Sequence, residues 1–138
     1  MGWLFYAFVS AGAAAVTAIL AKVGVEGVPS TLATAVRTVV VLIFSWGLVF
    51  SFGEHRALAT VSRRSLMFLL LSGIGTGVSW LAYFRALQLG PASRVAPIDK
   101  LSLPLTIIFA VVLLHEPLSW RLGIGVSLMV VGALLTIG

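Results

Sequence analysis

Five long runs of apolar residues occupy most of the chain, and short polar breaks separate them. Each run holds about 18 to 24 residues, enough to cross the roughly 30 Å hydrocarbon layer at a rise of about 1.5 Å per residue. Lipid cannot satisfy loose backbone groups, and the runs do not alternate as barrel strands do, so they must form helices. The predicted fold is therefore all-α and integral to the membrane, a five-transmembrane-helix bundle. The predicted helices cover approximately residues 3–21, 32–52, 66–89, 95–114 and 120–137.

Composition and charge narrow the class of protein. The 138 residues are 60% hydrophobic and 9% charged, unlike a water-soluble domain of ordinary make-up. The net charge of +5 comes from basic residues near helix ends, so we expect membrane lipid as a partner and no nucleic acid. With no cysteine and two histidines in different loops, we expect neither a metal site nor a cofactor. The sequence shows no nucleophile with a positioned base and no phosphate loop, so we do not expect an enzyme.

Four ionisable residues interrupt the apolar runs, namely Arg37, Arg85, Asp99 and Lys100. A charge inside hydrocarbon is costly, and such residues usually mark a pathway or a relay. Because successive helices reverse direction, the start of the second helix, the end of the third and the start of the fourth lie on one side of the membrane. We therefore predict that all four residues share one layer, about 8 Å into the apolar region.

One acid faces three bases in this layer, so at most one tight bidentate pair can form. We predict that Asp99 pairs with Arg85 across the short hairpin at Gly90, leaving a surplus of positive charge. Insertion scales assign about 2.5 to 3.5 kcal/mol to an unpaired Arg, Lys or Asp at a helix centre, so pairing or hydration is needed. Long basic side chains at this depth can also snorkel to the headgroups, and for Lys100 this interpretation stays open beside a functional one.

Polar and aromatic residues near these charges are candidates for the wall of a cavity. Asp99, Ser102 and Thr106 recur on one face of the fourth helix and form a polar stripe toward the midplane. Trp80 and Tyr83 lie within about a turn of the arginine in the third helix. We expect these residues to contribute to binding of a small-molecule substrate or to its coupling.

Prolines and glycines give the helices further features. Pro97 and Pro104 interrupt backbone hydrogen bonding in the fourth helix, so we expect a kink or partial unwinding there, a common binding-site device in transporters. Small residues in the third and fifth helices allow close packing against another helix or another subunit. These candidates for packing or dimerisation are Gly73, Gly77, Gly125 and Gly132.

Several motifs together indicate a family. They are the segment from Ala86 to Pro97 (ALQLGPASRVAP), Pro104 with the apolar run after it, His115 to Ser119 (HEPLS), and Gly123, Gly125 and Gly132. On these residues the chain resembles the EamA-type family of the drug/metabolite transporter superfamily, over nearly all five helices. The resemblance implies a multi-pass transporter of small metabolites, in a bacterial or archaeal plasma membrane, without naming the cargo. It implies a structural role for Glu116.

The resemblance also bears on assembly. Many members carry two such units in tandem, whereas this chain has one. An odd number of crossings inverts the second copy, so a single unit needs a partner chain, and we predict a homodimer that works by alternating access. Basic residues nearly balance on the two sides, so an antiparallel dual-topology dimer and a fixed orientation both stay open. They are Arg56, Arg63, Arg64 and Arg121 on one side, and Lys22, Arg37, Arg85, Arg94 and Lys100 on the other.

The surplus of Arg and Lys favours an anionic or zwitterionic, amino-acid-like cargo, with Asp99 as a candidate proton-coupling group. Two alternatives remain. The chain could be an accessory or assembly subunit of another membrane protein, whose residues would satisfy the charges. Efflux of lipophilic compounds in the manner of the small multidrug resistance proteins needs an acid in the first helix, and residues 1–21 contain none.

Overall fold

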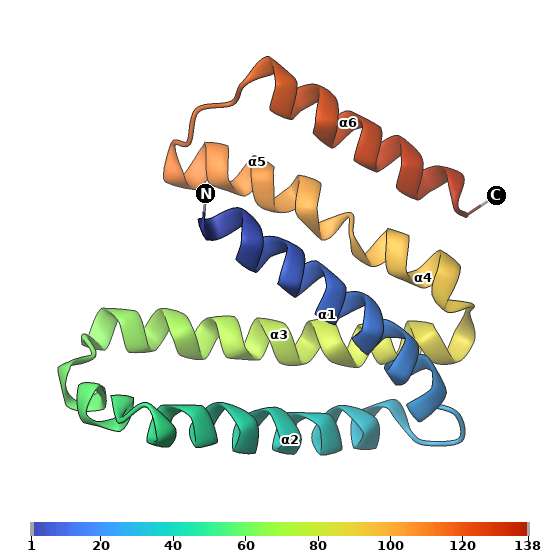
Figure 1. Ribbon diagram of the computed structural model, residues 1–138. Coiled ribbons are helices and arrows are strands. Elements are labelled where there is room, and N and C mark those ends of the chain that lie inside the picture. The colour runs from blue at the N-terminus through green and yellow to red at the C-terminus, as the bar shows by residue number, and fades with distance from the viewer. Residues whose placement is uncertain (1, 138) are drawn as a thin grey trace. The chain divides into compact units, whose positions relative to one another are not determined.

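A computed structural model describes residues 2–137, most of which are helical (Figure 1). The helices are α1 (Gly2–Gly24), α2 (Ser30–Ser51), the 3-10 helix η1 (Glu54–Thr60), α3 (Arg63–Leu89), α4 (Ala92–Asp99), α5 (Ser102–Leu114) and α6 (Trp120–Leu135). The first three α-helices and the stretch Ala92–Leu114 are long and apolar enough to cross a membrane, and α6 is a shorter apolar helix. The predicted all-α membrane fold is confirmed.

Backbone packing divides the chain into two units. The hairpin unit spans Leu20–Gln88 and holds the end of α1, all of α2 and η1, and nearly all of α3. The terminal unit comprises the residues up to Ile19 and those from Leu89 onward, with the first part of α1 and all of α4, α5 and α6.

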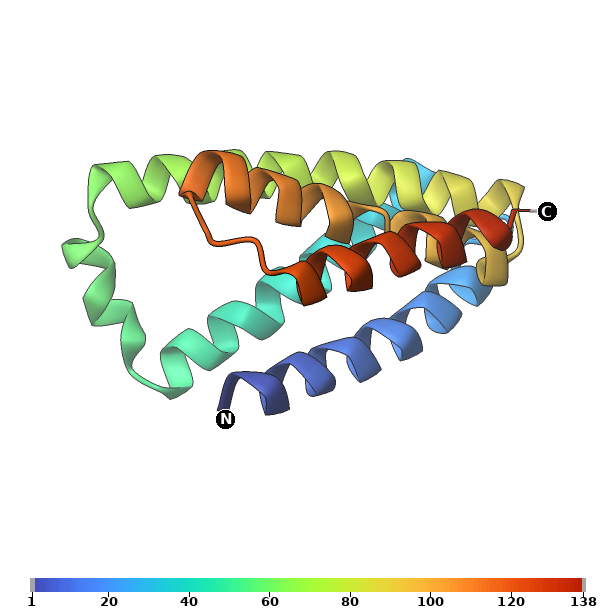
Figure 2. The same cartoon turned by 90° about the horizontal axis from the view of Figure 1, so that it is seen from above.

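In the hairpin unit, α2 and α3 run antiparallel and are joined through η1. They lie close where α2 begins and α3 ends, and they diverge toward η1 (Figure 2). Gly27 and Gly53 have φ angles of 73° and 71° at the two turns of this unit, a left-handed conformation that glycine adopts without steric cost. Pro29 directly precedes α2, where its fixed φ suits a helix start and its missing N–H is not needed.

The buried residues of the hairpin unit gather near the end where α2 begins and α3 ends. Val25, Phe84 and Leu87 are exposed by only 2%, 2% and 0%. Thr34 is also buried, and its hydroxyl donates to the Ser30 carbonyl at 2.8 Å, which satisfies it without a tertiary partner. Large apolar side chains along all five of the longer helices are exposed instead, as expected where helix faces meet lipid or another chain.

In the terminal unit, α6 packs against both α4 and α5. The chain leaves α5 at His115, whose φ of 56° gives a left-handed helix end. It enters α6 at Ser119, whose hydroxyl oxygen accepts a hydrogen bond from the Leu122 backbone N–H at 3.2 Å, a standard N-cap. Pro104 and Ala133 are buried in this unit.

Candidate functional site

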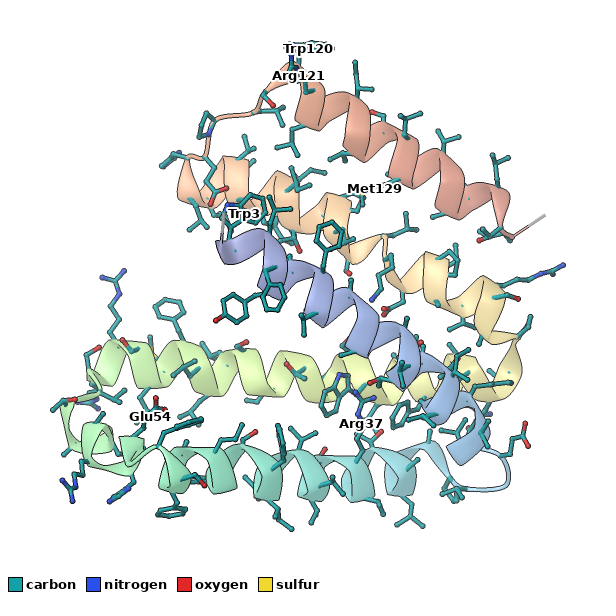
Figure 3. The ribbon with its side chains drawn as sticks, viewed as in Figure 1. Trp3, Arg37, Glu54, Trp120, Arg121 and Met129 are labelled. Carbon is teal, nitrogen blue, oxygen red and sulfur yellow. The ribbon has the colours of Figure 1, made fainter. Side chains whose placement is uncertain are left out.

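Arg37 lies between α2 and α3 and contacts aromatic rings (Figure 3). Its guanidinium carbon is 4.3 Å from the centroid of the Trp80 ring and 5.4 Å from that of Phe84. Arg37 and Trp80 are half-buried and Phe84 is buried. A cation over an aromatic face is attracted by the ring quadrupole, and the attraction grows as water is excluded. The rings therefore hold the Arg37 charge within the apolar part of the hairpin unit.

Arg85 is exposed and lies about one turn before the end of α3. Its Nη1 donates to the Gln88 side-chain oxygen at 3.2 Å. The Gln88 side-chain nitrogen in turn donates to the Val28 carbonyl, and the Val25 carbonyl lies 3.4 Å away. These bonds connect Arg85 to the turn between α1 and α2.

Lys22 adds a third cation at the same end of the hairpin unit. Its ammonium donates to the backbone carbonyl of Leu87 in the last turn of α3. The last carbonyls of a helix have no intrahelical partner and carry partial negative charge, so a cation there is favourable. Lys22, Arg37 and Arg85 are called the basic cluster below.

The basic cluster has an excess of positive charge. Glu26 and Glu54 are the acids of the hairpin unit, and within Leu20–Gln88 neither Arg37 nor Arg85 forms an ion pair. From Ser30 to Arg37 the α2 axis rises about 10 Å, so Arg37 lies well inside a candidate membrane span. A cation at that depth favours water or an anion as a further partner.

Asp99 and Lys100 lie in the terminal unit, where α4 ends. The Lys100 ammonium is 3.3 Å from an Asp99 carboxylate oxygen, while Lys100 is exposed and Asp99 half-buried. Asp99 is the last residue of α4 and Lys100 its C-cap, so the long lysine side chain reaches the neighbouring carboxylate locally. Arg85 and Asp99 belong to different units, so the predicted pairing of these two residues stays a prediction.

The backbone hydrogen bonding changes at Lys100 and Leu101, between the two prolines, although both residues keep helical backbone angles. Pro97 lies inside α4 and Pro104 inside α5, and neither has an N–H to donate. Two hydrogen bonds of the i→i−3 type replace the α-helical i→i−4 pattern. They run from the Leu101 N–H to the Ile98 carbonyl and from the Leu103 N–H to the Lys100 carbonyl, both at 3.0 Å. Asp99 and Lys100 thus border a break inside the apolar stretch Ala92–Leu114.

The other predicted site residues take more local roles. Ser102 begins α5, and its carbonyl accepts from the Thr106 hydroxyl at 2.8 Å. The Tyr83 ring lies 6.4 Å, centroid to centroid, from that of Phe84. A Cβ added at each of four glycines would meet no atom within 4 Å in the described chain, so their predicted packing role stays a prediction. They are Gly73, Gly77, Gly125 and Gly132.

Sequence reasoning did not identify Gln88 and Lys22 as part of the site. The signal for Gln88 was its position three residues after Arg85, which places both on one helix face. For Lys22 no spacing rule could indicate that it would reach the end of α3. Among residues 2–137, no three His, Cys, Asp or Glu side chains group as metal ligands would.

Comparisons with known proteins give the family. An uncharacterized transporter encoded in the cobO 3' region of Sinorhizobium sp is 48% identical over 133 residues, which cover 96% of this chain and 94% of that protein. No solved structure matches the chain significantly. The sequence profile of the EamA-like transporter family matches residues 1–138. This multi-pass membrane chain therefore belongs to the EamA-like transporter family.

Proposed function

We propose that the protein transports small polar metabolites that carry a carboxylate, amino-acid-like compounds above all, and that it works as a homodimer by alternating access. The observation that supports this cargo class best is the pair Arg37 and Arg85, two guanidinium groups without an ion pair inside the hairpin unit. Each arginine offers a planar set of N–H donors that matches a carboxylate in two-point fashion.

The surroundings of Arg37 suit ligand binding. Contact with the faces of Trp80 and Phe84 positions the guanidinium without using any of its five N–H donors. A ligand carboxylate would meet those donors where water is scarce, so that its attraction to them is stronger than in bulk water. The aromatic rings would also contact the apolar part of a metabolite.

Asp99 is our candidate for proton coupling. It borders the helix break, is half-buried, and has one adjacent cation, Lys100 at 3.3 Å. Broken helices at membrane depth are common ion and substrate sites in transporters, because their free backbone groups line a cavity. Protonating this carboxylate would leave Lys100 without its counter-charge, and we propose that this change of charge couples proton binding to transport.

Two features support the proposal of a homodimer, namely the odd number of membrane crossings and the exposed apolar surface. A five-helix unit places its ends on opposite sides of the membrane, so an inverted second copy would supply the other half of an alternating-access carrier. Large apolar residues of α6 such as Leu128, 67% exposed, and Leu135, 76% exposed, leave surface available for such a copy. Whether the two copies are antiparallel is tested by fusing reporters to the carboxyl terminus, since signal from only one side of the membrane excludes dual topology.

The cargo class is tested on purified protein with matched compounds. A thermal-shift screen compares amino acids with their methyl esters, together with sugars and nucleosides, and flux into liposomes follows for each compound that binds. We expect stabilisation and flux from free carboxylates and neither from the esters. Arg37→Gln should abolish the difference, whereas Arg56→Gln, in η1, serves as the control and should retain it. An absence of binding and flux across the whole panel would instead favour an accessory subunit.

A further inference from the structure

Gln88 occupies the junction between a member of the basic cluster and the turn that connects α1 to α2. Its side-chain oxygen accepts from Arg85, and its side-chain nitrogen lies near the carbonyls of Val25 and Val28. The reversed amide would put oxygen against two carbonyl oxygens and an NH2 group against a guanidinium. Only the orientation described satisfies every partner.

We propose that Gln88 is a positioning residue that couples Arg85 to the Val25–Val28 turn, and so acts as a latch on this end of the hairpin unit. The inference rests on the proposed function for its role in transport, in which a cargo carboxylate draws Arg85 away from Gln88. The carboxamide then loses the donor that fixes its oxygen, and its hydrogen bonds to the turn weaken.

The turn itself has the properties of a closed element held by few bonds. Val25 is exposed by only 2%, yet Gly27 and the exposed Glu26 beside it have open surroundings. The backbone hydrogen bonds from Glu26 N–H to the Val23 carbonyl and from Val28 N–H to the Val25 carbonyl are both long, at 3.4 Å. The hydrogen bond from the Gln88 side-chain nitrogen to the Val28 carbonyl is shorter than either of these and comes from outside the turn, so it contributes to the order of the turn.

A second contact at this end of the hairpin unit, between Lys22 and Leu87, does not involve Arg85. Lys22 binds the Leu87 carbonyl, next to Gln88 in the chain. This contact holds α1 to the end of α3 independently of the carboxamide. Release of Gln88 should therefore loosen the turn without unfolding the end of either helix.

The chain has no cysteine, so a single thiol at the buried Val25 reports opening of the turn. The full-length protein carrying Val25→Cys is treated with N-ethylmaleimide in detergent, and each rate is divided by the rate after denaturation in SDS. Gln88→Glu keeps an acceptor for Arg85 but has no donor for the turn. Gln88→Lys keeps a donor for the turn but repels Arg85. Both substitutions preserve a long side chain.

The latch predicts a specific pattern of rates. Loss of a neutral hydrogen bond changes an equilibrium constant by a factor of about 2 to 10. We expect Gln88→Glu to favour the open turn, and so to raise the labelling rate, by that factor. Arg85→Gln should raise it about twofold or more when Gln88 is present, and not at all in the Gln88→Lys chain. Arg56→Gln, the control for loss of a charge, should change nothing. Equal effects of Arg85→Gln in both backgrounds, or none in either, would overturn the coupling.

A second arm separates this inference from the proposed cargo. Sodium succinate is added to the Val25→Cys protein and compared with sodium chloride at equal ionic strength. We expect faster labelling with succinate, and no response once Arg85→Gln is introduced. If the rate pattern of the variants holds but succinate has no effect, the coupling by Gln88 stands and carboxylate binding at Arg85 is wrong.

Discussion

The contact between Arg37 and Trp80 gives the sharpest energetic prediction. Cation–π interactions contribute about 0.5 to 1 kcal/mol at exposed sites and about 2 kcal/mol when desolvated. The guanidinium carbon lies 4.3 Å from the ring centroid and both residues are half-buried. We therefore expect a coupling energy of about 1 kcal/mol, which is roughly a fivefold change in the unfolding equilibrium constant.

A double-mutant cycle measures this energy. Arg37→Gln and Trp80→Leu are made singly and together, and the unfolding free energy of each protein is obtained by titrating SDS into mixed micelles while helicity is followed by circular dichroism. The cycle subtracts the packing that is lost with the ring alone. Arg64 and Phe68 provide a matched control, since their contact is 6.0 Å and both are exposed. A coupling for Arg37 and Trp80 no greater than that of the control pair would refute the reasoning.

Three further predictions concern transport and stability. Arg85→Gln should raise the KM for carboxylate cargo about tenfold with little change in kcat, measured as initial flux into liposomes; a change in kcat alone would contradict a binding role. Asp99→Asn should abolish uptake driven by a pH gradient while counterflow of cargo continues; unchanged pH-driven uptake would exclude Asp99 as the coupling group. Lys22→Met should lower the unfolding free energy by about 1 to 2 kcal/mol, because the Leu87 carbonyl loses its charged donor; equal stability in the same SDS titration would show that water replaces the ammonium.

The helices could be predicted because the bilayer restricts the alternatives. An apolar run near the length of the hydrocarbon layer can satisfy its backbone hydrogen bonds internally only as a helix. The structure places helices on all five runs. The residues at which the helices end, and the structure of the connections between them, were less predictable. Glu54–Thr60, in the polar break after α2, forms a 3-10 helix; the i→i−3 hydrogen bonds of such a helix suit short connectors and leave little pattern in a sequence.

It was easier to predict which residues belong to the candidate site than to predict which of their side chains contact one another. Its position within about a turn of Arg85 in the sequence made Trp80 a candidate site residue, and Arg37 contacts its ring. The partner of Arg85 was harder, because helix directions indicate which residues share a layer but not which side chains meet. Gln88 lies one turn away on the same helix and needs no tertiary arrangement to reach Arg85. Likewise, Lys100 is adjacent to Asp99 in the chain and needs no tertiary arrangement to reach its carboxylate.

The central claim, that the basic cluster selects carboxylate cargo, is tested most directly by competition during flux. Uptake of a radiolabelled amino acid into liposomes is measured against the same unlabelled amino acid, its methyl ester and its decarboxylated amine. We predict that the free amino acid competes and that the ester and the amine do not, in protein with Arg37 and Arg85 intact. Competition by the amine equal to that of the amino acid would show that the carboxylate is not recognised, and would contradict the assignment.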